Sequence, residues 1–550
     1  MVSSLLADAL RDPTEQLQGL YASSSSVDFP RVVSEHFSRV FKTAEAFKEI
    51  PPLDVKHPPE SYPDRSLVRF RAMVQDTSPS SEMYLANYKD GSVGGWGIDS
   101  QQPEEDHDDV DYGNLRECTV LWAVNVPGES KWSAEELDGS DIPASASSPP
   151  QSLRPHKSPY SEGDHHVGVK VKLYDNALTE SFKSTDVVTF VGILSTEHSS
   201  HDLVSDPIDV PTLHVLFVAP DERTSIARQY PIELEDGSSD LNISQIRQDL
   251  VHWLASEALA GDEHAAEWIL LSTIARTQSR NPALLQPSLN LTQFPPPPIP
   301  TTSSGTSSSS STSQPLPPPY HPTLTHVLSH LLPLTHTLPL SLPFLNTIPF
   351  APESKDEDLH AGALQLPKGS VLLITEGGVQ EGKLHERGIV NVHALQEVMS
   401  SQTLSYNFPF SSFSFPTDVS CIVLSEGRKS AFFRTDLVVP LRPQTSAANV
   451  NLYKPASSIN MPPPQRLTAF RDLIVGAQSG KVQVSEATSE YIQQDFVTER
   501  QRNKAVTGDD LIRRMTVAKL YALSQHKTEL TIDIWEQAKT LDEQRLARLT

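Results

Sequence analysis

Stretches that cannot build a hydrophobic core divide this chain, and they constrain its fold more than any other feature. The strongest, Pro295 to Pro319, is a PPPPIP run, a Ser/Thr tract and a PLPPP run. A second, Gly139 to Pro159, reads GSDIPASASSPPQSLRPHKSP. Such segments bury little apolar surface and are expected to be disordered. A weaker break spans Arg442 to Pro464, and an acidic run, expected to be a solvated loop, spans Asp99 to Asp111. The chain is therefore expected to contain several separate structured regions.

Length and charge narrow the class of protein. The chain has 550 residues, which at typical domain sizes corresponds to roughly two to four domains. Its net charge is −25. Duplex DNA is bound through clustered Lys and Arg, so direct DNA binding by the whole chain is not favoured. Acidity fits association with basic protein surfaces, and it also fits a merely soluble acidic protein.

Cysteine usage and the absence of a long apolar run indicate an intracellular protein. Cys118 and Cys421 are the only cysteines, so neither a disulfide framework nor a structural zinc site is expected, and a reducing compartment fits. The sequence has no run of about 18 apolar residues, the length expected of a membrane-spanning helix. Residues Met1 to Arg11 lack the basic start of a signal peptide. Nucleus and cytosol both remain open.

The first half of the chain predicts helices followed by a β domain. Apolar residues at helical spacing between Asp28 and Lys48 predict one or two helices. Six strands are then expected, at Leu67–Gln75, Met83–Tyr88, Leu115–Val126, Gly168–Leu173, Val187–Leu194 and Leu213–Val218. Short strands with intervening loops favour a closed antiparallel barrel or a sandwich. The turn at Asp186 followed by the run DVVTFVGIL is typical of an oligonucleotide-binding (OB) barrel.

An OB barrel binds single strands through aromatic and basic side chains. Here the candidates are Phe70, Arg69, Arg71 and Lys172. The alternative interpretation, favoured by the acidity of the region, is that these are core aromatics with solvated flanking residues.

The second half alternates helices and apolar strands. Two helices are expected between Ile246 and Ser279, with Asp262 capping the second. Strands at Leu289–Thr292, Ser370–Ile374 and Ser420–Leu424 and helices at Leu324–Leu332 and Val392–Met399 predict an α/β region with a parallel sheet. Helices at Gly508–Ser524, with Asp509 as the cap, and at Thr531–Leu549 end the chain.

The search for catalytic motifs finds no enzyme. Gly377 to Lys383, GGVQEGK, fits the phosphate-binding pattern G-x-x-x-x-G-K, but Leu384 stands where a magnesium-binding Ser or Thr belongs. His326 and His330 share one face of a predicted helix without an evident third zinc ligand. No G-x-S-x-G or HExxH occurs. We assign no catalytic, cofactor-binding or metal-binding residue.

Several ordered blocks extend along most of the chain, at Ser66–Asp76, Val126–Trp132, Val171–Ser195, Leu254–Ala275, Gly362–Glu376, Leu424–Ser430 and Asp509–Arg545. Together these blocks resemble the mini-chromosome maintenance (MCM) complex-binding protein family. The second half also resembles the MCM ATPase core. Thr375-Glu376 occupies the position of the Asp-Glu pair of Walker B, and Cys421–Gly427 that of sensor one. The strand expected to carry Walker A, Leu289 to Pro295, leads into proline.

The resemblance implies a multidomain α/β protein in four parts. These are an N-terminal helical segment (residues 1–60), an OB-like β domain (61–225) with a disordered insert at about 133–165, a degenerate AAA+ α/β domain (240–445) with a Pro/Ser-rich insert at about 295–320, and a helical lid-like domain (465–550).

The resemblance also implies a non-catalytic adaptor in the nucleus, with the cytoplasm as an alternative location. It would bind MCM helicase subunits in place of one hexamer member, without a cofactor, and meet chromatin only indirectly. The resemblance further implies a role in assembly, stabilisation or unloading of the MCM complex. It also implies roles in DNA replication, the cell cycle, cell division, mitosis and sister chromatid cohesion. Interface candidates are the exposed faces of Asp509–Leu549 and the loop near Glu104. The alternatives are a single-strand-binding OB protein and a generic replication scaffold.

Overall fold

The computed structural model forms two compact units, each assembled from separate parts of the chain. The first contains Met1–Ile226, Ile348–Lys368 and Ser405–Ser414, and the second contains Ala227–Thr347, Gly369–Leu404 and Phe415–Thr550. The structure describes residues 4–23, 28–88, 91–98, 112–139, 157–159, 166–179, 182–199, 208–232, 243–281, 283–297, 321–355, 358–444 and 452–549. The acidic run near Glu104 and most of the two Pro/Ser inserts lie outside these residues.

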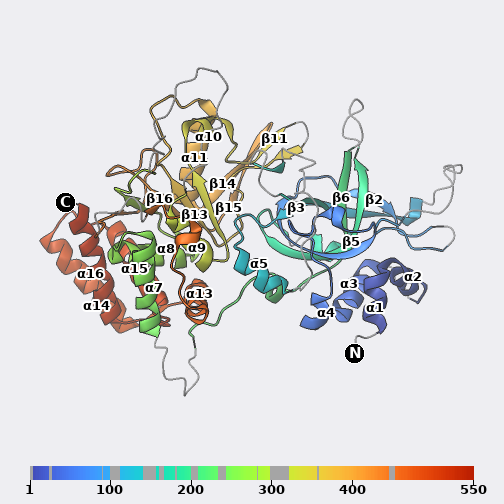
Figure 1. Ribbon diagram of the computed structural model, residues 1–550, viewed down its shortest axis with the longest axis horizontal. Helices are drawn as coiled ribbons and strands as arrows, with labels where there is room; N and C mark the ends of the chain where they lie inside the picture. Colours follow the sequence, from blue (N-terminus) through green and yellow to red (C-terminus); the bar gives the residue numbers. More distant parts are fainter. Residues whose placement is uncertain are drawn as a thin grey trace, which may run out of the picture. The chain divides into compact units, whose positions relative to one another are not determined.

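A sheet closed into a ring forms the centre of the first unit (Figure 1). Its strands are β1 (Ser66–Asp76), β2 (Glu82–Leu85), β3 (Leu115–Asn125), β4 (Gly168–Leu173), β5 (Val187–Ser199) and β6 (Ile208–Val218). They follow the order β1-β5-β6-β4-β3-β2, and β1 also pairs with β3, which closes the ring. Of the two alternatives that the sequence left open, a closed barrel or a sandwich, the closed arrangement is the one observed. The expectation of purely antiparallel pairing was wrong, because β4 and β6 run parallel.

Alternating side chains of these strands fill two cores. In β1, Val68, Phe70, Ala72 and Val74 belong to the cluster inside the ring, as the two-residue period of a strand requires. Val191 and Ile193 of β5 face a second cluster, which is completed by the N-terminal helices α1 (Ser4–Arg11), α2 (Pro13–Ser23), α3 (Phe29–Val40) and α4 (Ala44–Lys48). These helices therefore share a core with the sheet. Gly192 sits where the β5–β6 register shifts, and a Cβ there would lie 2.3 Å from the carbonyl oxygen of His214.

Part of the insert expected to be disordered at about 133–165 is structured. The helix α5 spans Lys131–Asp138. Lys157 is 1% exposed, and its Nζ lies 2.7 Å from Asp76 Oδ2 and also contacts Asp358. A short helix, α6 (Asn176–Thr179), follows β4.

A small four-stranded sheet has the order β12-β11-β14-β15. It contains β11 (Glu353–Lys355), β12 (Asp358–His360), β14 (Thr403–Phe408) and β15 (Ser411–Pro416). The sequence patterns did not predict it, because its strands are short and largely polar or exposed.

A five-stranded parallel sheet forms the core of the second unit. Its order is β10-β13-β16-β9-β17, with β9 (Leu289–Thr292), β10 (Thr335–Pro339), β13 (Ser370–Thr375), β16 (Val419–Leu424) and β17 (Leu437–Pro440). The apolar runs of β13 and β16 are buried almost throughout, as expected for a sheet covered on both faces. Helices α7 (Ile243–Ala258), α8 (Glu263–Ile274), α9 (Thr323–Leu331), α10 (Leu342–Thr347) and α11 (Glu386–Ser401) belong to the same unit.

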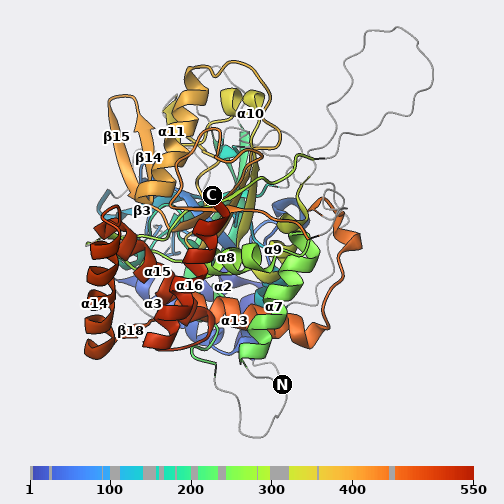
Figure 2. The same ribbon diagram turned by 90° about the vertical axis from the view of Figure 1, so that its left-hand side faces the viewer.

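Four helices end the chain: α13 (Pro464–Ser479), α14 (Glu486–Arg502), α15 (Gly508–Ser524) and α16 (Ile532–Leu549). Figure 2 shows α14, α15 and α16 beside one another. Side chains of α13, α15 and α16 share one core cluster with α7, α8 and the parallel sheet. Two-residue strands, β18 (Gln483–Val484) and β19 (Glu529–Leu530), pair in parallel between these helices.

Helix caps explain where several helices begin. Asp262 accepts the amide of Ala265 at 3.1 Å, which confirms the predicted cap of α8. The predicted cap of α15 was wrong, because Thr507 rather than Asp509 fills that position, in a capping box with Asp510. The helix α11 begins at Glu386, six residues before the expected start at Val392.

None of the helices in the described ranges is long and apolar enough to cross a membrane.

Candidate functional site

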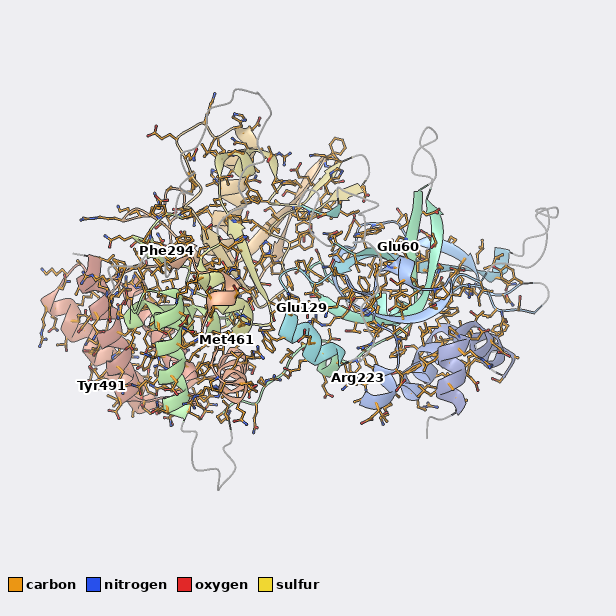
Figure 3. All side chains as sticks on the ribbon, in the orientation of Figure 1. Glu60, Glu129, Arg223, Phe294, Met461 and Tyr491 are labelled. Atoms are coloured by element: carbon orange, nitrogen blue, oxygen red, sulfur yellow. The ribbon has the colours of Figure 1, made fainter. Side chains whose placement is uncertain are left out.

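The carboxyl edge of a parallel sheet is where such folds bind their ligands, and here the residues directly after β9 pack against Tyr453. Phe294 is 3% exposed and is followed by Pro295, Pro296 and Pro297. The Tyr453 hydroxyl donates to the carbonyl oxygen of Pro295 at 2.8 Å, and its ring lies edge-on to Phe294 at 6.0 Å. Figure 3 labels Phe294 at this position. Proline has no amide hydrogen, so this loop cannot supply the row of N–H donors that holds a phosphate.

The carboxylate that follows β13 belongs to Glu376, and its hydrogen bonds are made within the protein. Glu376 is 5% exposed, and it accepts the hydroxyl of Ser430 and the amide of Ala431, the latter at 3.0 Å. Burial raises the pKa of Glu376, against the opposing effect of these hydrogen bonds. The preceding residue is Thr375, so the second carboxylate of a magnesium-binding Asp-Glu pair is absent from the sequence.

The G-x-x-x-x-G-K pattern at Gly377–Lys383 follows β13 rather than the first strand of the sheet. A Cβ on Gly377 would lie 3.0 Å from Pro297, so the loops after β13 and β9 are in close contact. The helix α11 begins three residues after Lys383, closer than the sequence indicated. The start of α11 therefore does not exclude a phosphate loop. The position of Gly377–Lys383 after β13, and Leu384 in place of Ser or Thr, argue against one.

The four residues considered for single-strand binding are buried or paired. Phe70 is fully buried inside the ring. Arg69 is 6% exposed and donates to the carbonyl of Ile50 at 2.8 Å. Arg71 pairs with Glu129, labelled in Figure 3, and donates to the carbonyl of Thr224. Lys172 lies 2.5 Å from Glu197 and 2.8 Å from Glu82. None of these side chains is available to stack on a base or meet a phosphate in this conformation.

A hydrogen-bonded Ser–His pair inside the first unit escaped the motif search, because its members are distant in sequence. Ser195 Oγ lies 2.8 Å from His214 Nε2, and the Tyr174 hydroxyl lies 2.8 Å from His214 Nδ1. His214 is 1% exposed, and burial together with the nearby Lys172 lowers its pKa to about 3. A base this weak is a poor proton acceptor at neutral pH. The cluster is therefore better explained as a structural network than as a nucleophile with its base.

The histidine and cysteine candidates are dispersed. His326 and His330 lie on α9, where burial lowers the pKa of each. In the ranges that the structure covers, no group of three or more His, Cys, Asp or Glu could hold a metal ion. Cys118 and Cys421 are both buried free thiols, and burial raises their pKa to about 11 and about 12 respectively.

These features define a two-unit α/β protein in which proline and aromatic residues follow the strand where a nucleotide-binding loop would be expected. A family model described as "Mini-chromosome maintenance replisome factor" matches residues 37–170 and 143–549. Proteins named mini-chromosome maintenance complex-binding protein align along nearly their whole length. The one from Salmo salar is 25% identical (98% of this chain, 97% of the relative), that from Arabidopsis thaliana 27% (96% and 95%) and that from Homo sapiens 23% (98% and 98%).

The chain belongs to the mini-chromosome maintenance replisome factor family, because the family model covers most of its length. The family resemblance read from the sequence blocks is thereby confirmed.

Proposed function

We propose that this protein is a non-catalytic nuclear adaptor that binds subunits of the MCM replicative helicase and takes the place of one hexamer member. The observation that carries the proposal is the end-to-end relationship to proteins named for binding the MCM complex. Assembly, stabilisation or unloading of the MCM complex during DNA replication and sister chromatid cohesion would be the cellular task. Contact with chromatin would be indirect.

Two features of the fold support an OB-like domain followed by a degenerate AAA+ domain. Five of the first unit's strands close into a ring, which fits an OB barrel. In the second unit, β9 lies between β16 and β17, as fits the first strand of a nucleotide-binding sheet. The C-terminal helices that pack on this sheet would be the lid. Such a module can keep the surfaces by which helicase subunits pack side by side.

The absence of catalysis is supported by the filled edge. A nucleotide site needs donors for the phosphates and carboxylates for magnesium. Here prolines follow β9, and the carboxylate of Glu376 is bound to Ser430 and Ala431. We therefore expect no ATP hydrolysis by the isolated protein.

Exposed apolar side chains in the last two helices support the proposed interface. Ile512 on α15 and Leu546 and Leu549 on α16 are 56%, 39% and 43% exposed. Large apolar side chains exposed on neighbouring helices are candidates for contact with a partner.

Co-expression with all six MCM subunits tests the proposal. After size exclusion, mass spectrometry should find this protein with several MCM subunits and with one hexamer member missing. Recovery without any MCM subunit would reject the adaptor function. Recovery with a complete hexamer would keep the binding but reject the replacement of a subunit. An ATPase assay of the purified protein, with an active helicase as the positive control, should give the rate of the buffer blank.

A further inference from the structure

An apolar groove of about 240 Å³ opens within the second unit, between α15 and a short hairpin. The hairpin consists of β7 (Ser279–Arg280) and β8 (Ala283–Leu284). The α15 side contributes Leu511, Ile512, Met515 and Lys519 to the lining. The segment from Leu284 to Pro287 contributes the facing side.

The apolar side chains of the groove are incompletely covered. Leu511 and Met515 pack partly against the core of the unit. Ile512 remains 56% exposed and Leu284 37% exposed. Exposed aliphatic side chains around a concavity favour the binding of another apolar group.

Gln286 gives the groove a polar point of recognition. Its side chain lines the groove and is 3% exposed, yet neither Oε1 nor Nε2 has a hydrogen-bond partner among the described residues. Buried polar atoms are nearly always hydrogen-bonded, and leaving one unsatisfied destabilises the fold. A carboxamide offers one acceptor and donors side by side, which match the N–H and C=O groups of a peptide backbone.

Size and charge specify the ligand further. The groove is smaller than the roughly 300–1,000 Å³ of typical small-molecule sites, so it fits one or two side chains better than a cofactor. Arg276 and Lys519 line it, and no acidic residue is among its described lining residues. The Arg276 guanidinium already donates to the carbonyl oxygen of Gly369, so an acidic group beside the bound apolar side chain would complement Lys519.

We propose that this groove binds an extended segment of a partner protein through an apolar anchor side chain with an acidic neighbour. The Gln286 carboxamide then donates to a backbone carbonyl of the segment and accepts a backbone amide. This site does not depend on the partner being an MCM subunit. The peptide test described next contains no helicase, so its failure would leave the co-expression test unaffected.

Selection of displayed random 12-residue peptides on the full-length protein tests this directly. The enriched peptides should share a large apolar residue next to Asp or Glu, and synthetic versions should bind in a fluorescence anisotropy assay. Ile512→Asp should weaken their binding at least tenfold. The matched control Val497→Asp changes another apolar residue, 53% exposed and on α14, and should leave binding unchanged.

Gln286→Met separates recognition from folding. Methionine keeps the length of the side chain and removes the unsatisfied polar atoms, so the melting temperature should stay the same or rise while peptide binding falls at least fivefold. A marked drop in melting temperature would show that the amide already has a partner in the free protein, and would overturn the proposal.

Three further outcomes would overturn the peptide-binding proposal. Failure to select any peptide, or binding that is equal in wild type and Ile512→Asp, overturns it. If sedimentation shows a dimer that Ile512→Asp dissociates, the groove binds a second copy of this chain and the peptide proposal is wrong.

Discussion

On and beside the ring sheet of the first unit, several basic side chains are paired with carboxylates or carbonyls. At the carboxyl edge of the parallel sheet, in contrast, proline and aromatic residues take the place of polar donors. Arg71, Lys157 and Lys172 illustrate the first case. Phe294, Pro295 and Tyr453 illustrate the second. A cation whose partner is buried, as Asp76 is, is costly to remove, because that partner is then left buried and charged. A side chain that fills an edge contributes mainly by packing.

The largest expected effect comes from Lys157 in the first unit. Lys157→Met keeps the volume of the side chain but leaves Asp76, whose side chain is 1% exposed, without its cation. We expect a loss of about 3–5 kcal/mol in the free energy of unfolding, measured by urea denaturation. Lys355→Met is the control, because Lys355 is 47% exposed and pairs with Glu353 at the surface. A loss below about 1 kcal/mol for Lys157→Met would show that the buried Lys157–Asp76 pair contributes little to the stability of this unit.

Phe294→Ala tests the filled edge of the second unit. The change removes a ring that is 3% exposed, and we expect a loss of about 3 kcal/mol, the low end for a buried phenylalanine, since Phe294 lies in a loop. Phe413→Ala, at a ring that is 56% exposed, is the control and should change stability little. Binding of a fluorescent ATP analogue should stay absent, because the prolines remain. A gain of ATP binding would mean that only the phenylalanine ring blocks the site.

Local sequence patterns predicted those elements whose own residues determine them. The buried strands β9, β13 and β16 and the capped helix α8 lie close to their expected bounds, because continuous apolar runs and an Asp cap are visible in the sequence. The edge strands β10 and β17 were missed, since they are short and each ends in proline. The parallel pairing of β4 with β6 depends on how the ring closes, which no local pattern encodes.

The site residues were less predictable than the elements, because their partners are distant in sequence. Lys157 lies in a Ser/Pro-rich stretch, and its partner Asp76 is 81 residues away. The Tyr174–His214–Ser195 network likewise joins separate strands and loops. In contrast, the loss of phosphate donors after β9 was visible at once, because proline lacks the amide hydrogen wherever it occurs.

The pH dependence of stability tests the buried network of the first unit. His214 faces Tyr174 and Ser195, with Lys170, Lys172, Arg65, Glu82 and Glu197 nearby. Its folded pKa of about 3 lies below the unfolded value of 6.5, so the unfolded state binds the proton more readily. The contribution of neutral His214 is therefore complete above pH 6.5 and is lost as the pH falls toward 3.

Between pH 6 and pH 5 this loss should be about 1 kcal/mol. We expect His214→Gln to lower stability at pH 7 but to flatten the decline between pH 6 and pH 5, as measured by urea unfolding at each pH. His252→Gln, at an exposed histidine, is the control and should keep the wild-type slope. An unchanged slope in His214→Gln would mean that this histidine does not control the acid sensitivity of the first unit.

The smallest effect is expected for Tyr453→Phe, and it separates the two ways of filling the edge of the parallel sheet. The change keeps the ring against Phe294 and removes only the hydrogen bond to Pro295, so the loss should be about 1 kcal/mol in thermal or urea unfolding. Tyr491→Phe, on α14 (Figure 3), loses an exposed hydrogen bond to Glu536 and should have a smaller effect. If Tyr453→Phe were as damaging as Phe294→Ala, the edge would be held by its hydrogen bond rather than by packing. The contrast with the ion-paired ring sheet would then no longer hold.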